Sequence, residues 1–185
     1  MKSWRSGARG LGLVLLLAVS GCAGAEAAPP PVSPSPARAA APAKGPSDEA
    51  RLVCTGRTAE HISGALGVAA RSPLQPSWSE DVYACDYAYP DGSTMRLSVK
   101  DLADAGATTA YFEAKRAVAG PVTVLEGMGE GAFERADGSV VVRKDNTVLV
   151  VDVSALAATL GTPPRPRANV ARTVATTVLI CWVEY

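Results

Sequence analysis

Cysteine thiols, Cys181 among them, could supply a nucleophile in this 185-residue sequence, and the imidazole of His61, its only histidine, could supply a base. A general base acts only within hydrogen-bond reach of the proton that it takes. These two residues lie far apart in the sequence, and no serine stands in the G-x-S-x-G pattern of a nucleophile elbow. We therefore expect no catalytic residue, and we interpret His61 as a surface or half-buried structural histidine.

Three glutamates, Glu126, Glu130 and Glu134, recur every four residues. That spacing places carboxylates on one face of a helix, but this stretch is expected to be strand and loop, so paired-carboxylate catalysis is not indicated. The glycines of Gly127-Met128-Gly129-Glu130-Gly131 match neither the dinucleotide-binding nor the P-loop pattern. We interpret this run as a bend between strands.

Composition and spacing argue against other classes of ligand. One histidine and no C-x-x-C pair cannot supply the usual zinc ligands, so we expect no metal and no cofactor. The 18 basic and 18 acidic residues balance, whereas a general nucleic-acid binder shows a basic excess. A hydrophobic content of 48% is that of a folded protein and not of a disordered chain.

The N-terminus has the layout of a secretion signal. Lys2, Arg5 and Arg9 precede an unbroken apolar run over residues 11–19, and small residues follow. A transmembrane helix needs roughly 20 apolar residues, so this run is too short for a permanent span. We expect the chain to be exported.

Val19-Ser20-Gly21-Cys22 resembles a bacterial lipobox. In such signals the cysteine thiol is alkylated by diacylglycerol before cleavage, which here would make Cys22 the new N-terminus. Two or more acyl chains anchor a protein stably, where one chain does not. We therefore expect residues 1–21 to be a lipoprotein signal peptide, and the protein to be anchored by lipid on the extracytoplasmic face of the cell membrane. A plain secretory signal with a chance cysteine is the alternative.

Two further regions follow the lipidated cysteine. Residues 22–50 are rich in Pro and Ala and lack apolar periodicity, which predicts a disordered tether that spaces the domain from the membrane. Residues 51–185 have frequent aliphatic residues and regular turn signals, which predict one folded domain.

Thiols tend to pair in the oxidising compartments where exported proteins reside. Cys54 precedes the first predicted helix and Cys85 lies in the first predicted strand, so a Cys54–Cys85 disulfide would join helix to sheet. It would close a loop of about 30 residues, worth roughly 3–4 kcal/mol in the chain-entropy model. Cys181 falls on the apolar side of the last predicted helix, and the sequence leaves open whether it is free or paired.

Aromatic side chains mark two possible contact surfaces. Tyr83, Tyr87 and Tyr89 alternate with other residues, so they share one strand face with Cys85. They either pack in the core or line a pocket beneath a helix, with their hydroxyl groups at its rim. Trp78, in a predicted loop over residues 72–80, is a candidate exposed contact point.

Hydrophobic periodicity predicts three helices and six strands. The helices are expected over 58–68, 105–118 and 166–183, and the strands over 82–89, 95–99, 122–125, 132–135, 139–144 and 147–153, with a loop over 154–165. The end of the last segment also suits a strand. Hairpin turns between strands argue for an antiparallel sheet that the helices must cover. We predict an α+β fold, an α/β/α sandwich.

Several short motifs together resemble a family of secreted actinobacterial lipoproteins of unknown function. They are the lipobox at Cys22, the Pro/Ala tether, Cys54 before the first helix, the Cys-x-Tyr strand at Cys85–Tyr87 and the Gly127–Ala132 bend. The resemblance covers about residues 51–182. It implies a sandwich similar to the PsbP-like fold and a domain that binds partners or ligands with no established catalytic set.

The sequence thus predicts a non-catalytic, membrane-anchored binding domain of the cell envelope. Its partner would be an envelope protein, such as a membrane-embedded sensor, or a small apolar ligand. The alternatives are an envelope hydrolase with an unrecognised site and an accessory negative regulator of envelope-stress signalling. A hydrolase needs convergent polar groups, so a wide separation of His61, Glu126 and Glu130 would argue against it.

Overall fold

The computed structural model of the chain describes residues 45–183. The predicted signal peptide, Cys22 and nearly all of the predicted tether lie outside the described residues. Within residues 45–183, no helix has both the length and the hydrophobicity that a bilayer crossing requires.

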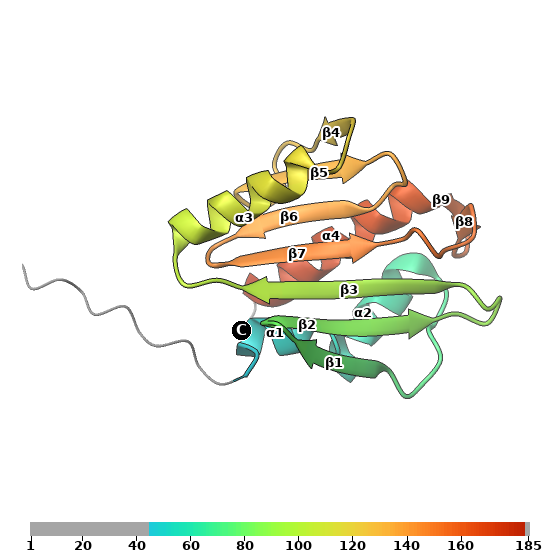
Figure 1. The fold of residues 1–185 in the computed structure, drawn as a ribbon. Helices are drawn as coiled ribbons and strands as arrows, with labels where there is room; N and C mark the ends of the chain where they lie inside the picture. Colours follow the sequence, from blue (N-terminus) through green and yellow to red (C-terminus); the bar gives the residue numbers. More distant parts are fainter. Residues whose placement is uncertain (1–44, 184–185) are drawn as a thin grey trace, which may run out of the picture. The chain divides into compact units, whose positions relative to one another are not determined.

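One antiparallel sheet of seven strands organises the domain, with the strand order β1-β2-β3-β7-β6-β5-β4 (Figure 1). The strands are β1 (Gln75–Ser79), β2 (Val82–Ala88), β3 (Thr94–Asp101), β4 (Val122–Val124), β5 (Gly131–Arg135), β6 (Val140–Lys144) and β7 (Thr147–Asp152). The helices are α1 (Asp48–Leu52), α2 (Gly56–Leu66), α3 (Ala105–Ala117) and α4 (Arg167–Val183), and a small second sheet pairs β8 (Thr159–Leu160) with β9 (Arg165–Pro166). The central pairing of β3 with β7 joins two meanders.

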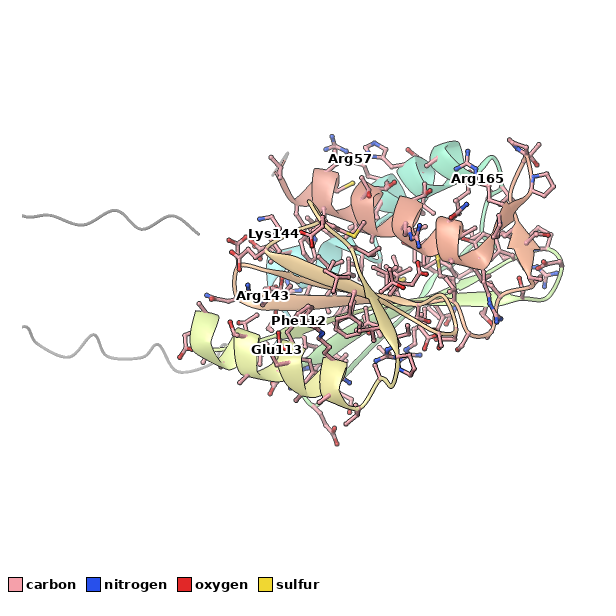
Figure 2. All side chains as sticks on the ribbon, turned by 90° about the horizontal axis from the view of Figure 1, so that it is seen from above. Arg57, Phe112, Glu113, Arg143, Lys144 and Arg165 are labelled. Carbon is pink, nitrogen blue, oxygen red and sulfur yellow. A yellow bond between two sulfur atoms is a disulfide. The ribbon has the colours of Figure 1, made fainter. Side chains whose placement is uncertain are left out.

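Helices cover the sheet on both faces, which confirms the predicted α+β sandwich (Figure 2). On one face, α1, α2 and α4 close the main core, where Leu66 and Val178 are 0% exposed. On the other face, α3 lies over β6 and β7, and Phe112 packs against Phe133 with their ring centroids 5.2 Å apart. The sheet is therefore the middle layer of three.

The alternation of side chains along the strands follows these layers. In β3, Met95, Leu97 and Val99 are 0% exposed and face the main core, while the residues between them face the other side. In β6 the run Val140–Val142 is fully buried, because α4 covers one face and α3 the other. This explains why β6 begins with three consecutive valines instead of alternating apolar and polar residues.

Most predicted elements occur within one or two residues of their expected ends. Asp104 caps α3, with its Oδ1 accepting from the Ala107 backbone N–H at 2.8 Å, and Gly67 ends α2 in the left-handed conformation. The final segment is helical to Val183, so its alternative as a strand is wrong. Helix α4 packs against α2 and the sheet, and this packing buries Val170, Val174 and Val178, which are spaced four residues apart, together with Cys181.

Three features differ from the sequence-based expectation. Helix α1 begins at Asp48, before the expected domain boundary at residue 51. The expected loop over 72–80 contains β1, an edge strand whose five residues all belong to the exposed surface, so no alternation of buried and exposed residues marks it. The expected loop over 154–165 contains the short strand β8 and the first residue of β9, whose second residue, Pro166, falls in the expected helix. Each of these elements is too short or too exposed for a hydrophobic period to develop.

Candidate functional site

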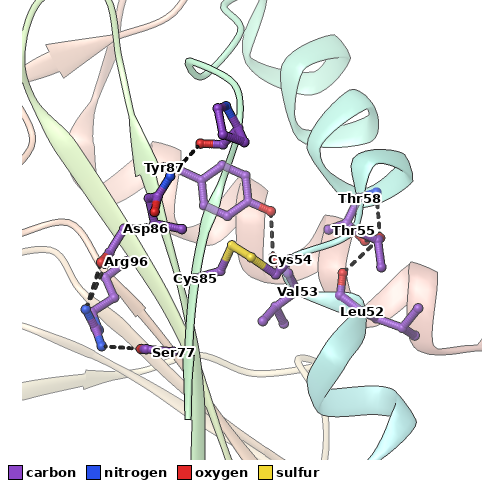
Figure 3. Close-up of a disulfide and its surroundings, with 12 residues drawn as sticks. Leu52, Val53, Cys54, Thr55, Thr58, Ser77, Cys85, Asp86, Tyr87 and Arg96 are labelled. Atoms are coloured by element: carbon purple, nitrogen blue, oxygen red, sulfur yellow. Dashed lines mark hydrogen bonds and ion pairs between the residues drawn. A yellow bond between two sulfur atoms is a disulfide. The ribbon is translucent and has the colours of Figure 1, made fainter.

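The turn between α1 and α2 is fixed to the sheet by the Cys54–Cys85 disulfide, which confirms the predicted pairing (Figure 3). The two Cα atoms are 5.3 Å apart, and Cys85 lies in the middle of β2. Beside the disulfide, Thr55 caps α2 by accepting from the Thr58 backbone N–H at 3.2 Å. Covalent and hydrogen bonds therefore hold the start of α2 in one place above β2.

Two tyrosines beside this disulfide are buried, but their hydroxyl groups have different surroundings. The Tyr87 hydroxyl donates to the Val53 carbonyl oxygen at 2.6 Å, and Tyr87 is 1% exposed (Figure 3). Tyr89 is 0% exposed, and its hydroxyl has no hydrogen-bond partner among the described residues. Burial raises the pKa of both tyrosines, and neighbouring Tyr89 and Cys181 raise that of Tyr87 further. Both therefore remain neutral at physiological pH.

Tyr87 and Tyr89 belong to the main core, and half-buried Tyr83 packs against its edge. Two cavities of the described domain, one at each end of α2, are lined by other residues. A tyrosine-lined pocket therefore stays a prediction. Trp78 is 37% exposed, as expected of a contact point, but it lies on the edge strand β1 and not in a loop.

The structure brings together two groups that the sequence keeps apart. The Cys181 thiol lies 3.5 Å from Nδ1 of His61, although 120 positions separate them. Cys181 is the free cysteine of the described residues and is 4% exposed, whereas His61 is exposed on α2. Helices α2 and α4 pack side by side, and this packing creates the contact. No motif predicts it, because a motif reports local spacing and not the pairing of distant helices.

The larger cavity lies between α1 and the last turn of α4 and has a volume of about 420 Å³. It is lined by Asp48, Glu49, Arg51, Leu52, Thr55 and Trp182. Trp182 Nε1 donates to the Glu49 carbonyl oxygen at 3.0 Å, which fixes the indole at the cavity wall. The Arg51 guanidinium lies 3.8 Å from the Asp48 carboxylate, an exposed ion pair within α1. The cavity thus combines an aromatic wall with charges of both signs.

A smaller cavity of about 240 Å³ lies at the opposite end of α2. Its lining includes Val68, Leu160 and the carboxylate of Asp91. Hydrogen bonds from the Ser93 hydroxyl and backbone N–H lower the pKa of Asp91, and nearby Arg71 lowers it further. This carboxylate is therefore a stable anion within the turn that follows β2.

Two of the three glutamates, Glu130 and Glu134, lie on opposite faces of the sheet. Glu130 pairs with Arg143 at 3.2 Å, and Arg143 also donates to Thr109 of α3 at 3.0 Å. Glu134 pairs with Arg172 of α4 at 2.7 Å, on the opposite face of the sheet. Since His61 lies on α2, on the side of the sheet away from α3, it does not converge with Glu130.

The glycine run is a bend before β5, as predicted. Gly129 has a φ of +59°, and a Cβ atom there would lie 2.6 Å from the Arg143 carbonyl oxygen. Glycine is required at this position by both backbone conformation and close approach. Among residues 45–183, no cluster of three or more potential metal-ligating side chains occurs.

Comparison with known protein families, curated proteins and solved structures finds no match to this chain. The resemblance to secreted actinobacterial lipoproteins accordingly stays an expectation.

Proposed function

We propose that this protein is a lipid-anchored extracytoplasmic lipoprotein whose domain binds a ligand or an envelope partner and catalyses no reaction. The observation that carries the proposal is the cavity of about 420 Å³ between α1 and the end of α4. Its volume lies within the range of small-molecule sites, roughly 300–1,000 Å³.

The lining of this cavity suits recognition. Trp182 offers a large apolar surface held in one orientation by its bond to the Glu49 carbonyl oxygen. Asp48, Glu49 and Arg51 supply charged groups at the mouth, where exposed side chains can exchange water for a ligand. The Thr55 hydroxyl of the lining bonds to the Leu52 carbonyl oxygen at 3.1 Å and to the Thr58 hydroxyl at 3.0 Å, and not to a carboxylate of the lining. The cavity therefore has the means to hold a molecule, and its lining suggests no reaction.

The position of the cavity agrees with an anchored protein. The sequence that follows the lipobox cysteine joins the described domain immediately before α1, the helix that supplies most of the cavity wall. The Cys54–Cys85 disulfide supports an oxidising compartment, since such bridges are rare in proteins of the cytosol.

Anchoring is tested by comparing the native chain with Cys22→Ala in cells. We expect mass spectrometry of the native protein to find a processed N-terminus carrying acyl chains on Cys22, and fractionation to place it in the membrane. Cys22→Ala should lose the acyl chains and the membrane association. An unmodified thiol or an uncleaved leader in the native protein would overturn the anchored part of the proposal.

Binding is tested by photo-crosslinking in cells from a benzoylphenylalanine residue at Asp48, an exposed residue of the cavity lining. The matched control places the same residue at Glu113, which is exposed on α3 on the opposite face of the sheet (Figure 2). We expect a discrete adduct from the Asp48 position, reduced by Trp182→Ala, and none from Glu113. Identical adducts from both positions, or none from the cavity, would contradict the binding role.

A further inference from the structure

We propose that Cys181 and His61 form a thiol–disulfide exchange site. The Cys181 sulfur takes an R–S group from a small disulfide, and His61 accepts the thiol proton and passes it to the leaving sulfur. This proposal goes beyond the binding role and does not depend on the lipid anchor. It rests on the 3.5 Å contact between the Cys181 thiol and His61 Nδ1.

The geometry gives the thiol a proton acceptor. The 3.5 Å separation is within the range of a hydrogen bond that involves sulfur, and an imidazole at this distance can take the proton of the thiol. The thiolate, and not the thiol, is the form that attacks disulfides. His61 is therefore positioned to take the proton that Cys181 must lose before it can attack a disulfide.

The thiol is buried, but the imidazole that contacts it is not. Cys181 is 4% exposed and lies in the last turn of α4. His61, its contact on α2, is exposed to solvent. A proton can thus pass from the buried sulfur through the exposed imidazole to water.

The elements packed around this pair carry further charged groups and one tyrosine. Helix α2 carries Arg57 and Glu60, α1 carries Asp48, Glu49 and Arg51, and Tyr87 of β2 is neutral. Cys181 lies in the last turn of α4, where the backbone carbonyl groups of a helix end disfavour an anion. The imidazole is therefore the group beside the thiol that can take its proton.

The reaction is a single exchange. His61 takes the thiol proton, the Cys181 thiolate attacks one sulfur of a disulfide R–S–S–R, and a new S–S bond forms as the old one breaks. The leaving thiolate takes the proton from the imidazolium and departs as R–SH. Cys181 ends as a mixed disulfide, and the small disulfide supplies the oxidising equivalents. A metal is a poorer candidate for this pair, because the described residues offer no third ligand beside it.

The test uses the full chain with Cys22→Ser, so that Cys181 is the one cysteine outside the disulfide. The probe is 2,2′-dithiodipyridine, whose reaction is followed by the absorbance of the released pyridinethione and by the mass of the adduct. The rate is measured from pH 5 to pH 9 in this parent, in His61→Asn and in Glu60→Gln. Glu60 is exposed on α2 next to His61 and serves as the matched control.

We expect one adduct per chain, at Cys181, and none in Cys181→Ser. At pH 6 the second-order rate should fall about tenfold or more in His61→Asn and stay unchanged in Glu60→Gln. The rate of His61→Asn should fall by about tenfold for each pH unit below neutral, as for an isolated thiol, whereas the parent should keep a shallower profile. The thermal unfolding midpoints of the parent and of both variants should agree, which excludes loosening of the helix pair as the cause.

Two results would overturn the proposal. One is an equal rate and an equal pH profile in the parent and His61→Asn, which would make the imidazole a neighbour without a role. The other is a thiol that reacts only after denaturation. If His61→Asn unfolds early, His61→Gln is measured in its place, and the same comparison decides the outcome.

Discussion

Tyr87 and Tyr89 are equally buried side chains of one segment, but their hydroxyl groups contribute differently to the stability of the fold. Both face the main core, and burial raises the pKa of both. The Tyr87 hydroxyl satisfies the Val53 carbonyl group at 2.6 Å, while the Tyr89 hydroxyl has no partner within the described chain. A hydrogen bond to a buried backbone group contributes mainly by preventing an unsatisfied partner. Removing each hydroxyl group in turn therefore compares a bonded with an unbonded hydroxyl in the same core.

Tyr87→Phe should lower the free energy of unfolding by about 1–3 kcal/mol, because it leaves the Val53 carbonyl group without its donor. Tyr89→Phe should change it by less than about 0.5 kcal/mol, because the lost hydroxyl made no bond. Urea unfolding of both variants with the disulfide intact provides the comparison. Equal losses would show that the Tyr89 hydroxyl has a partner in solution.

Among the elements, those with a buried periodic face were predictable and those without one were not. α3 and α4 bury residues three and four apart, and β3 buries every second residue, so each leaves a signal in the sequence. α1 has only five residues, and all five residues of β1 are exposed, so neither element produces a periodic pattern of apolar residues in the sequence. α1 is stabilised from outside: the Ser47 backbone N–H and hydroxyl both donate to the Asp101 carboxylate, each at 2.8 Å.

Replacing both cysteines of the disulfide, as Cys54→Ala with Cys85→Ala, should lower the free energy of unfolding by about 3–4 kcal/mol. The bridge joins residues 31 positions apart, and the unfolded chain without it gains that loop's entropy. The urea dependence should also steepen, because the unfolded state exposes more surface without the cross-link. Cys181→Ala is the control, since it removes a buried sulfur without removing a cross-link. A loss no larger than that of Cys181→Ala, with the same urea dependence, would contradict the chain-entropy explanation.

At the scale of the whole molecule, the sequence predicted the layers but not the contacts between distant helices. Hairpin turns such as Asp145-Asn146 identify neighbouring strands, and an antiparallel sheet with amphipathic helices allows few arrangements. The pairing of α2 with α4 has no such local marker, so the contact between His61 and Cys181 could not be foreseen. The cavity beside Trp182 could not be foreseen either, because α1, which forms most of its wall, is too short to show apolar periodicity in the sequence.

The domain boundary provides a test of how α1 contributes to the whole fold. A fragment over residues 45–185 keeps α1 and its contacts, whereas a fragment over 51–185, the boundary expected from composition, lacks most of that helix. The shorter fragment loses the fully buried Ala50, the Ser47–Asp101 hydrogen bonds and the Glu49 carbonyl group that accepts from Trp182.

We expect the shorter fragment to be less stable by about 2–4 kcal/mol, since each lost hydrogen bond contributes about 1 kcal/mol and bonds to a carboxylate contribute more. Urea unfolding of the two fragments measures the difference. The variant Ser47→Ala in the longer fragment should reproduce part of the loss, because it removes both the α1 cap and one bond to Asp101. Equal stability of the two fragments would mean that α1 packs on a domain that is already complete, and the cavity beside Trp182 would then be formed by an element that the fold does not require.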